Sequence, residues 1–226
     1  MESQISAPLS QLASLPNELL LHIMWLTGNY SAKANLARTC KGFYNTLIMD
    51  IYCYAGKQLK WVFMFEAAAD GNCRTLKKCH DAGAPIDYRP NRDALRPLQL
   101  AIKFYRPATT EYLLKLGANP DFVPGDDGGY GFEFRDLQSP LQQAVDSALQ
   151  PWIPIWAAPV RWRQRRMGIP GRNRLELNSR KIISILRQAG AKEKSLRYHD
   201  RTHLDAIELG HPCCTHHNAR AGRHRI

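Results

Sequence analysis

The amino-acid sequence predicts an all-α fold, in which a short helical module precedes an array of repeated helix pairs. Two observations carry this prediction. Apolar residues recur at the spacing of one helix face over residues 19–26, and again from about residue 34 to residue 47. The dipeptide Gly-Ala then follows apolar stretches at Gly83, Gly117 and Gly190, and the first two copies lie 34 residues apart. A fixed period of this length is typical of helical repeat proteins.

The composition is that of a globular chain with enough apolar residues to build a core. Of its 226 residues, 44% are hydrophobic and 23% are charged, so wholesale disorder is not expected. No apolar stretch reaches the roughly 18 uncharged residues of a membrane-spanning helix. Residues 1–16 have neither the basic start nor the apolar block of a secretory signal. We therefore expect an intracellular protein, cytoplasmic or nuclear, without a membrane partner.

The positive charge is concentrated towards the end of the chain. Residues 1–150 carry 15 basic and 15 acidic side chains, whereas residues 151–226 carry 16 and 5. The whole net charge of +11 therefore comes from the final third. This distribution indicates a basic segment joined to a neutral body rather than a basic domain.

The first helix is expected to begin near Pro16 and to end before Gly28. Ser14 is a candidate N-cap, Pro16 suits the first helical position, and Glu18 favours the positive end of the helix dipole. Its apolar stripe consists of Leu19, Ile23 and Leu26. A second helix is expected from about residue 34, with a stripe formed by Leu36, Cys40, Phe43 and Leu47. Two such short helices cannot cover each other completely, so they require a third helix or a partner.

Residues 13–50 contain two motifs in a fixed order. Leu15-Pro16-Asn17-Glu18-Leu19-Leu20 opens the first helix, and Leu36-Ala37 is followed by Cys40-Lys41 and Phe43. This pattern resembles the F-box, and the module is expected to span residues 13–55 after a flexible start at 1–12. The alternative is an ordinary helical hairpin with a capped first helix.

The repeated segments have similar beginnings as well as similar ends. Pro97-Leu98-Gln99-Leu100-Ala101 and Pro140-Leu141-Gln142-Gln143-Ala144 open two of the units, and each unit ends with Gly-Ala. Both openings resemble the Thr-Pro-Leu-His-x-Ala motif of ankyrin repeats, with glutamine in place of histidine. The resemblance implies an ankyrin-like solenoid of about three units over residues 61–192.

Two regions depart from the repeat. The third unit is about 30 residues too long between its two helices, which predicts an insertion at about residues 150–178. Residues 193–226 form a basic tail rich in histidine and cysteine, and residues 202–211 are a candidate for a degenerate closing unit.

The insertion combines aromatic and basic residues, namely Trp152, Trp156, Arg161, Trp162 and Arg163. Such residues suit a protein-binding site, because Trp and Arg dominate interface hot spots. They also suit stacking on bases and neutralising phosphates, although the prolines around them argue against a recognition helix. The third interpretation is a loop whose apolar residues rest on the array. Nucleic acid is the least expected partner.

The cysteines and histidines do not form a recognisable catalytic or metal site. We expect Cys40, Cys53, Cys73 and Cys79 to be buried thiols, and no acid–base partner lies beside Cys73 or Cys79 in the sequence. The tail contains His199, His203, His211, Cys213, Cys214, His216, His217 and His224. Their spacing does not match a zinc knuckle. The sequence also lacks common phosphate-loop, hydrolase and metalloprotease motifs, so no cofactor, metal or catalytic activity is expected.

The two resemblances together imply a substrate-recognition subunit of a cullin–RING ubiquitin ligase of the F-box type. The F-box would bind the Skp-type adaptor that connects it to the cullin, and the ankyrin-like face would hold an unknown target protein. The residues expected at the adaptor contact are Leu15, Pro16, Glu18, Leu19, Leu20, Ile23 and Leu36. The alternative function is a non-catalytic ankyrin scaffold, in which the F-box-like helices serve only as an N-terminal cap.

Overall fold

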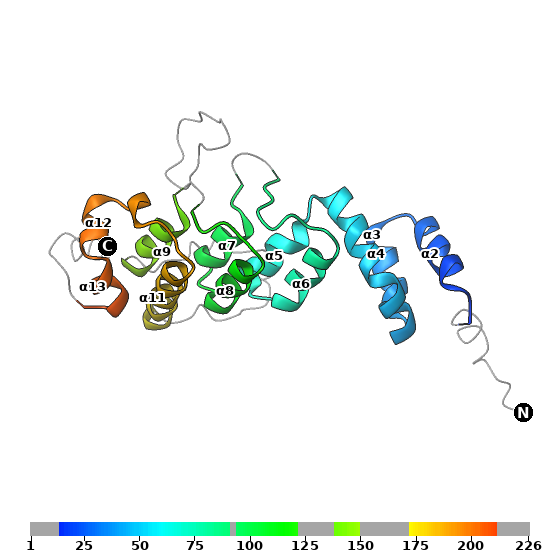
Figure 1. Cartoon of the computed structure of the whole chain (residues 1–226). Coiled ribbons are helices and arrows are strands. Elements are labelled where there is room, and N and C mark those ends of the chain that lie inside the picture. Colours follow the sequence, from blue (N-terminus) through cyan, green and yellow to red (C-terminus); the bar gives the residue numbers. More distant parts are fainter. Residues whose placement is uncertain (1–13, 91–93, 122–137, 150–171, 212–226) are drawn as a thin grey trace, which may run out of the picture. The chain divides into compact units, whose positions relative to one another are not determined.

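The computed structural model describes residues 14–90, 94–121, 138–149 and 172–211 (Figure 1). Over these residues the chain forms α-helices and no β-strand, which confirms the predicted all-α class. The chain divides into two compact units, of which the first comprises Met1–Val62 and Lys77–Ala84 and the second comprises Phe63–Leu76 and Pro85–Ile226. None of the described helices combines the length and the apolar character needed to cross a lipid bilayer.

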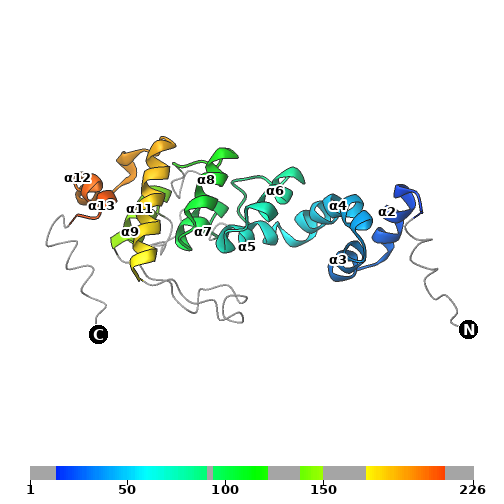
Figure 2. The ribbon, with the colours of Figure 1, turned by 90° about the horizontal axis from the view of Figure 1, so that it is seen from below.

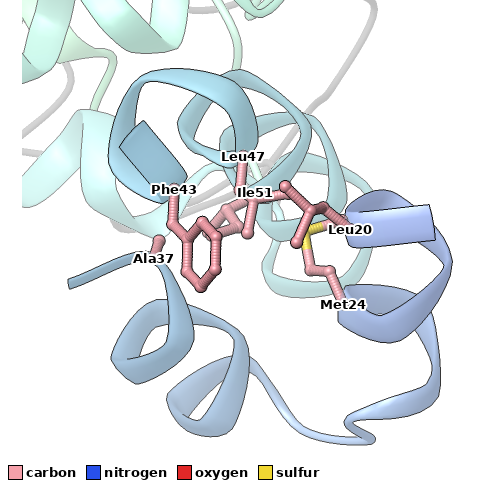
Figure 3. Close-up of a cluster of buried hydrophobic side chains, with 6 residues drawn as sticks. All are labelled: Leu20, Met24, Ala37, Phe43, Leu47 and Ile51. Carbon is pink, nitrogen blue, oxygen red and sulfur yellow. The ribbon is translucent and has the colours of Figure 1, made fainter. Parts of the chain in front are cut away.

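The first unit is built around its longest helix. Its three N-terminal helices are α2 (Asn17–Leu26), α3 (Tyr30–Arg38) and α4 (Lys41–Leu59). Both α2 and α3 pack against α4, which is the third helix that the two short amphipathic segments require. The side chains at the centre of this packing are Leu20, Met24, Ala37, Phe43, Leu47 and Ile51 (Figure 3).

The helix boundaries of this unit differ from the expected ones at two places. The first helix begins at Asn17, and Pro16 rather than Ser14 lies at its N-cap. The expected second helix is two helices, separated at Thr39 and Cys40. Cys40 is exposed instead of buried, because it lies at the N-cap of α4, where its Sγ accepts a hydrogen bond from the Phe43 N–H at 3.4 Å.

The remaining helices come in consecutive pairs. They are α5 (Val62–Asp70) and α6 (Cys73–Asp81), α7 (Pro97–Lys103) and α8 (Pro107–Lys115), α9 (Pro140–Leu149) and α11 (Arg172–Gln188), and, after a 3-10 turn at Glu193–Ser195, α12 (Tyr198–Thr202) and α13 (Leu204–Leu209). Within the second unit α7 packs on α8 and α9, and α11 packs on α8, α9 and α13 (Figure 2). Three of these helices begin with proline, whose missing N–H costs nothing at a first helical position.

Each of the three repeated Gly-Ala pairs lies at the end of a helix. Gly83, Gly117 and Gly190 have φ values of 91°, 93° and 83°, a left-handed conformation that residues with a Cβ adopt at a cost. After each glycine, the alanine N–H returns to a carbonyl of the preceding helix, as from Ala118 to Leu113 at 3.0 Å. These bonds satisfy carbonyls that the helix end would otherwise leave unpaired.

Aspartates join successive helix pairs at equivalent positions. The Asp87 carboxylate accepts a hydrogen bond from the Asn119 N–H at 3.1 Å, and the Asp121 carboxylate accepts one from the Lys192 N–H at 2.6 Å. Asp121 follows Gly117 by four residues, and the two donors follow Gly117 and Gly190 by two residues. The same contact therefore recurs between the second and third pairs of helices.

A second set of repeated contacts comes from the first helix of each pair. The Gln99 Nε2 donates to the Gln138 carbonyl at 3.2 Å, just before α9. One pair later, the Gln142 Oε1 accepts from the Arg197 N–H at 2.8 Å, just before α12, and its Nε2 donates to the buried Asp200 at 2.8 Å. Helices α12 and α13 thus form a fourth helix pair, which closes the array. This closing pair begins at Tyr198, earlier than the expected residue 202.

The insertion of the third unit is shorter than expected, because α11 already begins at Arg172. Two contacts hold the early part of this helix. Leu175 is buried with Ala69, Phe104 and Tyr105, and the Asn178 Nδ2 donates to the Tyr105 carbonyl at 3.1 Å. Residues 172–178 therefore belong to the helix pair.

Candidate docking face of the first unit

Three large apolar side chains of α2 are uncovered in the isolated chain, beside the exposed polar residues Glu18 and His22. Leu19, Trp25 and Leu26 are 51%, 53% and 73% exposed, and we call these three residues the α2 face. On the opposite side of the same helix, Leu20 and Met24 lie in the core (Figure 3). The helix thus carries large apolar side chains outside the core as well as within it. Exposed apolar residues that gather on one element are typical of interaction sites.

The residues expected at the adaptor contact fall into three groups. Pro16, Glu18 and Leu19 are exposed. Leu15, Ile23 and Leu36 are half-buried, and Leu15 and Leu36 pack against the core. Leu20 is only 4% exposed, so the expectation that it contributes to an outward surface is wrong. Its position one residue after Leu19 turns it towards α4, since consecutive residues of a helix do not share a face.

Two members of the α2 face were not among the expected contact residues. Leu26 follows Leu19 by seven residues and belongs to the same stripe, so the helical period was sufficient to find it. Trp25 lies beside that stripe, and nothing in the spacing distinguishes it from a core residue.

The end of α2 that carries Trp25 is tied to the other two helices by Lys33 of α3. The Lys33 Nζ donates hydrogen bonds to the Met24 carbonyl at 2.8 Å and to the Trp25 carbonyl at 3.3 Å. It also lies 5.3 Å from the centroid of the Trp25 ring and 4.7 Å from that of Tyr54 on α4. The two rings meet edge to face at 5.5 Å.

The described cysteines differ in burial and in pKa. Burial raises the pKa of the Cys79 thiol to about 11, so this group stays protonated at neutral pH and is a poor nucleophile. All the described cysteines were expected to be buried. Cys79 is buried, whereas Cys53 and Cys73 are only half-buried. Across residues 14–90, 94–121, 138–149 and 172–211, no cluster of three or more His, Cys, Asp or Glu side chains is arranged to hold a metal ion.

The candidate binding residues of the insertion cannot be placed on this framework. Trp152, Trp156, Arg161, Trp162 and Arg163 all lie outside the described residues. The same holds for the tail from residue 212 onward, which includes both cysteines of the Cys213-Cys214 pair. The interpretations of these segments stay predictions.

Comparison with protein-family models, curated proteins and solved structures finds no match to this chain. The likeness to the F-box and to ankyrin repeats therefore rests on the motifs in the sequence.

Proposed function

We propose that the chain is a substrate-recognition subunit of an F-box-type cullin–RING ubiquitin ligase, acting in the cytoplasm or nucleus. The first unit is the F-box and binds the Skp-type adaptor through the start and the exposed side of α2. The observation that carries the proposal is the α2 face, which leaves Leu19, Trp25 and Leu26 uncovered directly after a Leu-Pro start. In the family that this sequence resembles, the Leu-Pro start contributes to the adaptor contact.

The α2 face offers apolar side chains that a partner could bury. Burying one large apolar side chain contributes about 1.5–3 kcal/mol, and each 1.4 kcal/mol corresponds to about tenfold in affinity. Tryptophan is also enriched among the residues that dominate protein interfaces. Leu19, Trp25 and Leu26 would therefore be apolar contacts within a larger interface, to which other residues of the first unit contribute.

The second unit is the ankyrin-like part of the proposal and presents the target protein. Support comes from Gln99 and Gln142, which occupy the place of the family's histidine and hydrogen-bond to the next helix pair. Stacked pairs of this kind contact chiefly their neighbours and create an extended surface. Ubiquitin transfer itself would be carried out by other subunits, so we assign no catalytic residue to this chain.

The proposal is tested by measuring binding of the full chain to purified adaptor, and by recovery of the cullin with that complex. Replacing Leu15 and Pro16 together by alanine should weaken adaptor binding roughly ten- to a hundredfold, because it removes apolar contact of about 1.5–3 kcal/mol. Leu177→Ala, which alters a 49% exposed leucine of the second unit, is the matched control and should leave binding unchanged.

Unchanged binding in the double variant, with native helicity by circular dichroism, would contradict an adaptor contact at the start of α2. Failure of the unaltered chain to bind any adaptor would leave the non-catalytic scaffold, since the contacts that join the helix pairs do not depend on the α2 face.

A further inference from the structure

We propose that Lys33 is the positioning residue of the α2 face, because it fixes the indole of Trp25 in the orientation that the adaptor binds. The proposal rests on the proposed function and adds to it a residue that lies between the two motifs of the F-box-like module. Lys33 itself is buried and does not reach the surface of the unit.

The burial of Lys33 is the first observation. Its side chain is only 1% exposed, and it is among the largest fully buried side chains of the described chain. Lysine is rarely buried without a partner, because moving a charged group out of water is costly. No carboxylate pairs with Lys33 within the part of the chain that the structure describes. Something else must therefore compensate the ammonium group.

The end of α2 provides the first part of that compensation. The last carbonyls of a helix have no partner within the helix, and they form the negative end of its dipole. Lys33 donates to two of them, on Met24 and Trp25. Thr27 also caps the Met24 carbonyl with its hydroxyl at 2.5 Å. Lys33 is thus a C-terminal cap supplied to α2 from α3, and it holds the backbone of Trp25 in place.

Two aromatic rings provide the second part. The Lys33 ammonium lies within 6 Å of the ring centroids of both Trp25 and Tyr54, which is the range of a cation–π contact. The Tyr54 ring meets Trp25 edge to face. The indole is therefore held by an ammonium group and a second ring, while 53% of the residue stays exposed.

These contacts make Trp25 a pre-ordered anchor. A side chain that is already fixed loses less conformational entropy when a partner binds. The free energy of binding is then more favourable by about 0.5–1.5 kcal/mol per ordered side chain. Lys33→Met retains the length of the buried stem but removes the charge and all three N–H donors. We expect this variant to bind the adaptor about three- to tenfold more weakly, the loss that corresponds to that entropy.

A double-mutant cycle separates positioning from a general effect on the fold. Adaptor affinity is measured for the full chain carrying Lys33→Met, Trp25→Ala or both, with Lys57→Met as the control at an exposed lysine of the same unit. If Lys33 acts through Trp25, the lysine substitution should change affinity by less than about twofold once the indole is absent. Full additivity of the two losses would overturn the proposal.

A second readout uses the free chain. The indole N–H resonance of Trp25, assigned by its loss in Trp25→Phe, should shift in Lys33→Met and stay in place in Lys57→Met. An unmoved resonance would overturn the proposal. If Lys33→Met does not fold, Tyr54→Leu replaces it, because it removes the ring that contacts both Lys33 and Trp25; it should move the same resonance and weaken adaptor binding in the same range.

The two proposals can fail separately. If the unaltered chain does not bind the adaptor, the proposed function is wrong, and the docking role of Lys33 falls with it even when the resonance shifts. If the unaltered chain binds and Lys33→Met binds equally well, the proposed function stands and the positioning role is overturned.

Discussion

At the scale of single residues, buried polar side chains connect the helix pairs of the second unit. Gln142 is the clearest case, because its amide meets three partners: the Arg197 N–H at 2.8 Å, Asp200 at 2.8 Å and Asp146 at 3.1 Å. Asp200 is completely buried, so water cannot replace a partner that it loses. A buried polar group left without its partner costs more than the hydrogen bond contributed.

Gln142→Ala should therefore lower the free energy of unfolding by about 1–3 kcal/mol. Its neighbour provides the control. Gln143 is half-buried on the same helix, but its Oε1 has no hydrogen-bond partner among the described residues, so Gln143→Ala should have a clearly smaller effect. Urea denaturation followed by circular dichroism measures both variants, and equal losses would contradict the assigned role of Gln142.

The cysteines allow a second test at this scale. Cys40 is exposed, whereas Cys79 is buried and its raised pKa of about 11 leaves almost no thiolate at pH 7.5. Iodoacetamide should therefore modify Cys40 much faster than Cys79 in the native chain, and the difference should vanish in concentrated urea. Mass spectrometry of digested samples over time gives the two rates. Rapid modification of Cys79 in the native chain would contradict its burial.

At the scale of the elements, the sequence predicted helix boundaries best where a residue type has one dominant structural role. The glycines that end the helix pairs were identified from chemistry that holds in any context. The prolines were less certain guides: Pro97 and Pro140 were found through the resemblance to ankyrin repeats, whereas Pro16 lies at the N-cap instead of the first helical position. The break before α4 was missed, because Leu36, Cys40, Phe43 and Leu47 keep one helical phase across it. Cysteine is also an unusual N-cap.

Contacts between distant segments explain the other differences. The start of α11 depends on Leu175 and Asn178 meeting Phe104 and Tyr105, which are some seventy residues away in the sequence. The burial of Lys33 likewise depends on how three helices meet. Periodicity within one segment cannot reveal contacts of this kind. The apolar stripe of α2 was predictable, but the residue that holds its end was not.

The boundary of α11 gives a prediction for the insertion. Removing residues 151–171 should leave helicity and melting temperature nearly unchanged, because long insertions between fixed ends contribute little to the entropy of closing the loop. Removing residues 151–178 should be clearly destabilising, since it also deletes Leu175, which is 4% exposed. Thermal unfolding by circular dichroism compares the two deletions. A large loss in the shorter one would show that the tryptophans at 152, 156 and 162 belong to a core.

The closing pair gives a prediction for the end of the chain. A chain that stops after residue 211 should keep its stability, and a chelator should not unfold the intact protein, because we expect no structural metal in the tail. A chain that stops after residue 196 should be destabilised by several kcal/mol, since it loses the buried Leu204 and Ile207 and leaves the amide of Gln142 without two partners. Urea denaturation measures both truncations, and chelator-induced unfolding would reveal a metal site.

At the scale of the whole molecule, the boundary of the basic region at residue 151 does not coincide with the boundary between the two compact units. The excess of positive charge lies entirely in residues 151–226, and part of that region falls outside the described residues. Within the described part, two of its cations pair with carboxylates of the first 150 residues, Arg197 with Asp146 at 3.0 Å and Lys192 with Asp121 at 3.5 Å. Net charge alone therefore overstates how much free positive surface this region offers.

Nucleic-acid binding should accordingly be weak and without sequence preference. Basic side chains that contact only phosphates bind nucleic acid in a salt-dependent way. The logarithm of the affinity falls linearly with the logarithm of the salt concentration. Fluorescence anisotropy with labelled single-stranded DNA and RNA at 50 and 200 mM salt tests this expectation. Binding that persists at the higher salt and distinguishes between sequences would favour the nucleic-acid interpretation of the insertion.

The aspartate contacts between helix pairs bear on how such a chain lengthens during evolution. A duplicated copy of residues 97–121 carries both the donor position, at Asn119, and the acceptor, Asp121. Such a copy can therefore make the aspartate contact with a neighbouring pair on either side. The corresponding positions around the closing pair are Lys194, which cannot accept a hydrogen bond, and Pro212, which has no N–H to donate. As far as the aspartate contact is concerned, an added helix pair is thus better matched in the interior of the array than at the joint before α12.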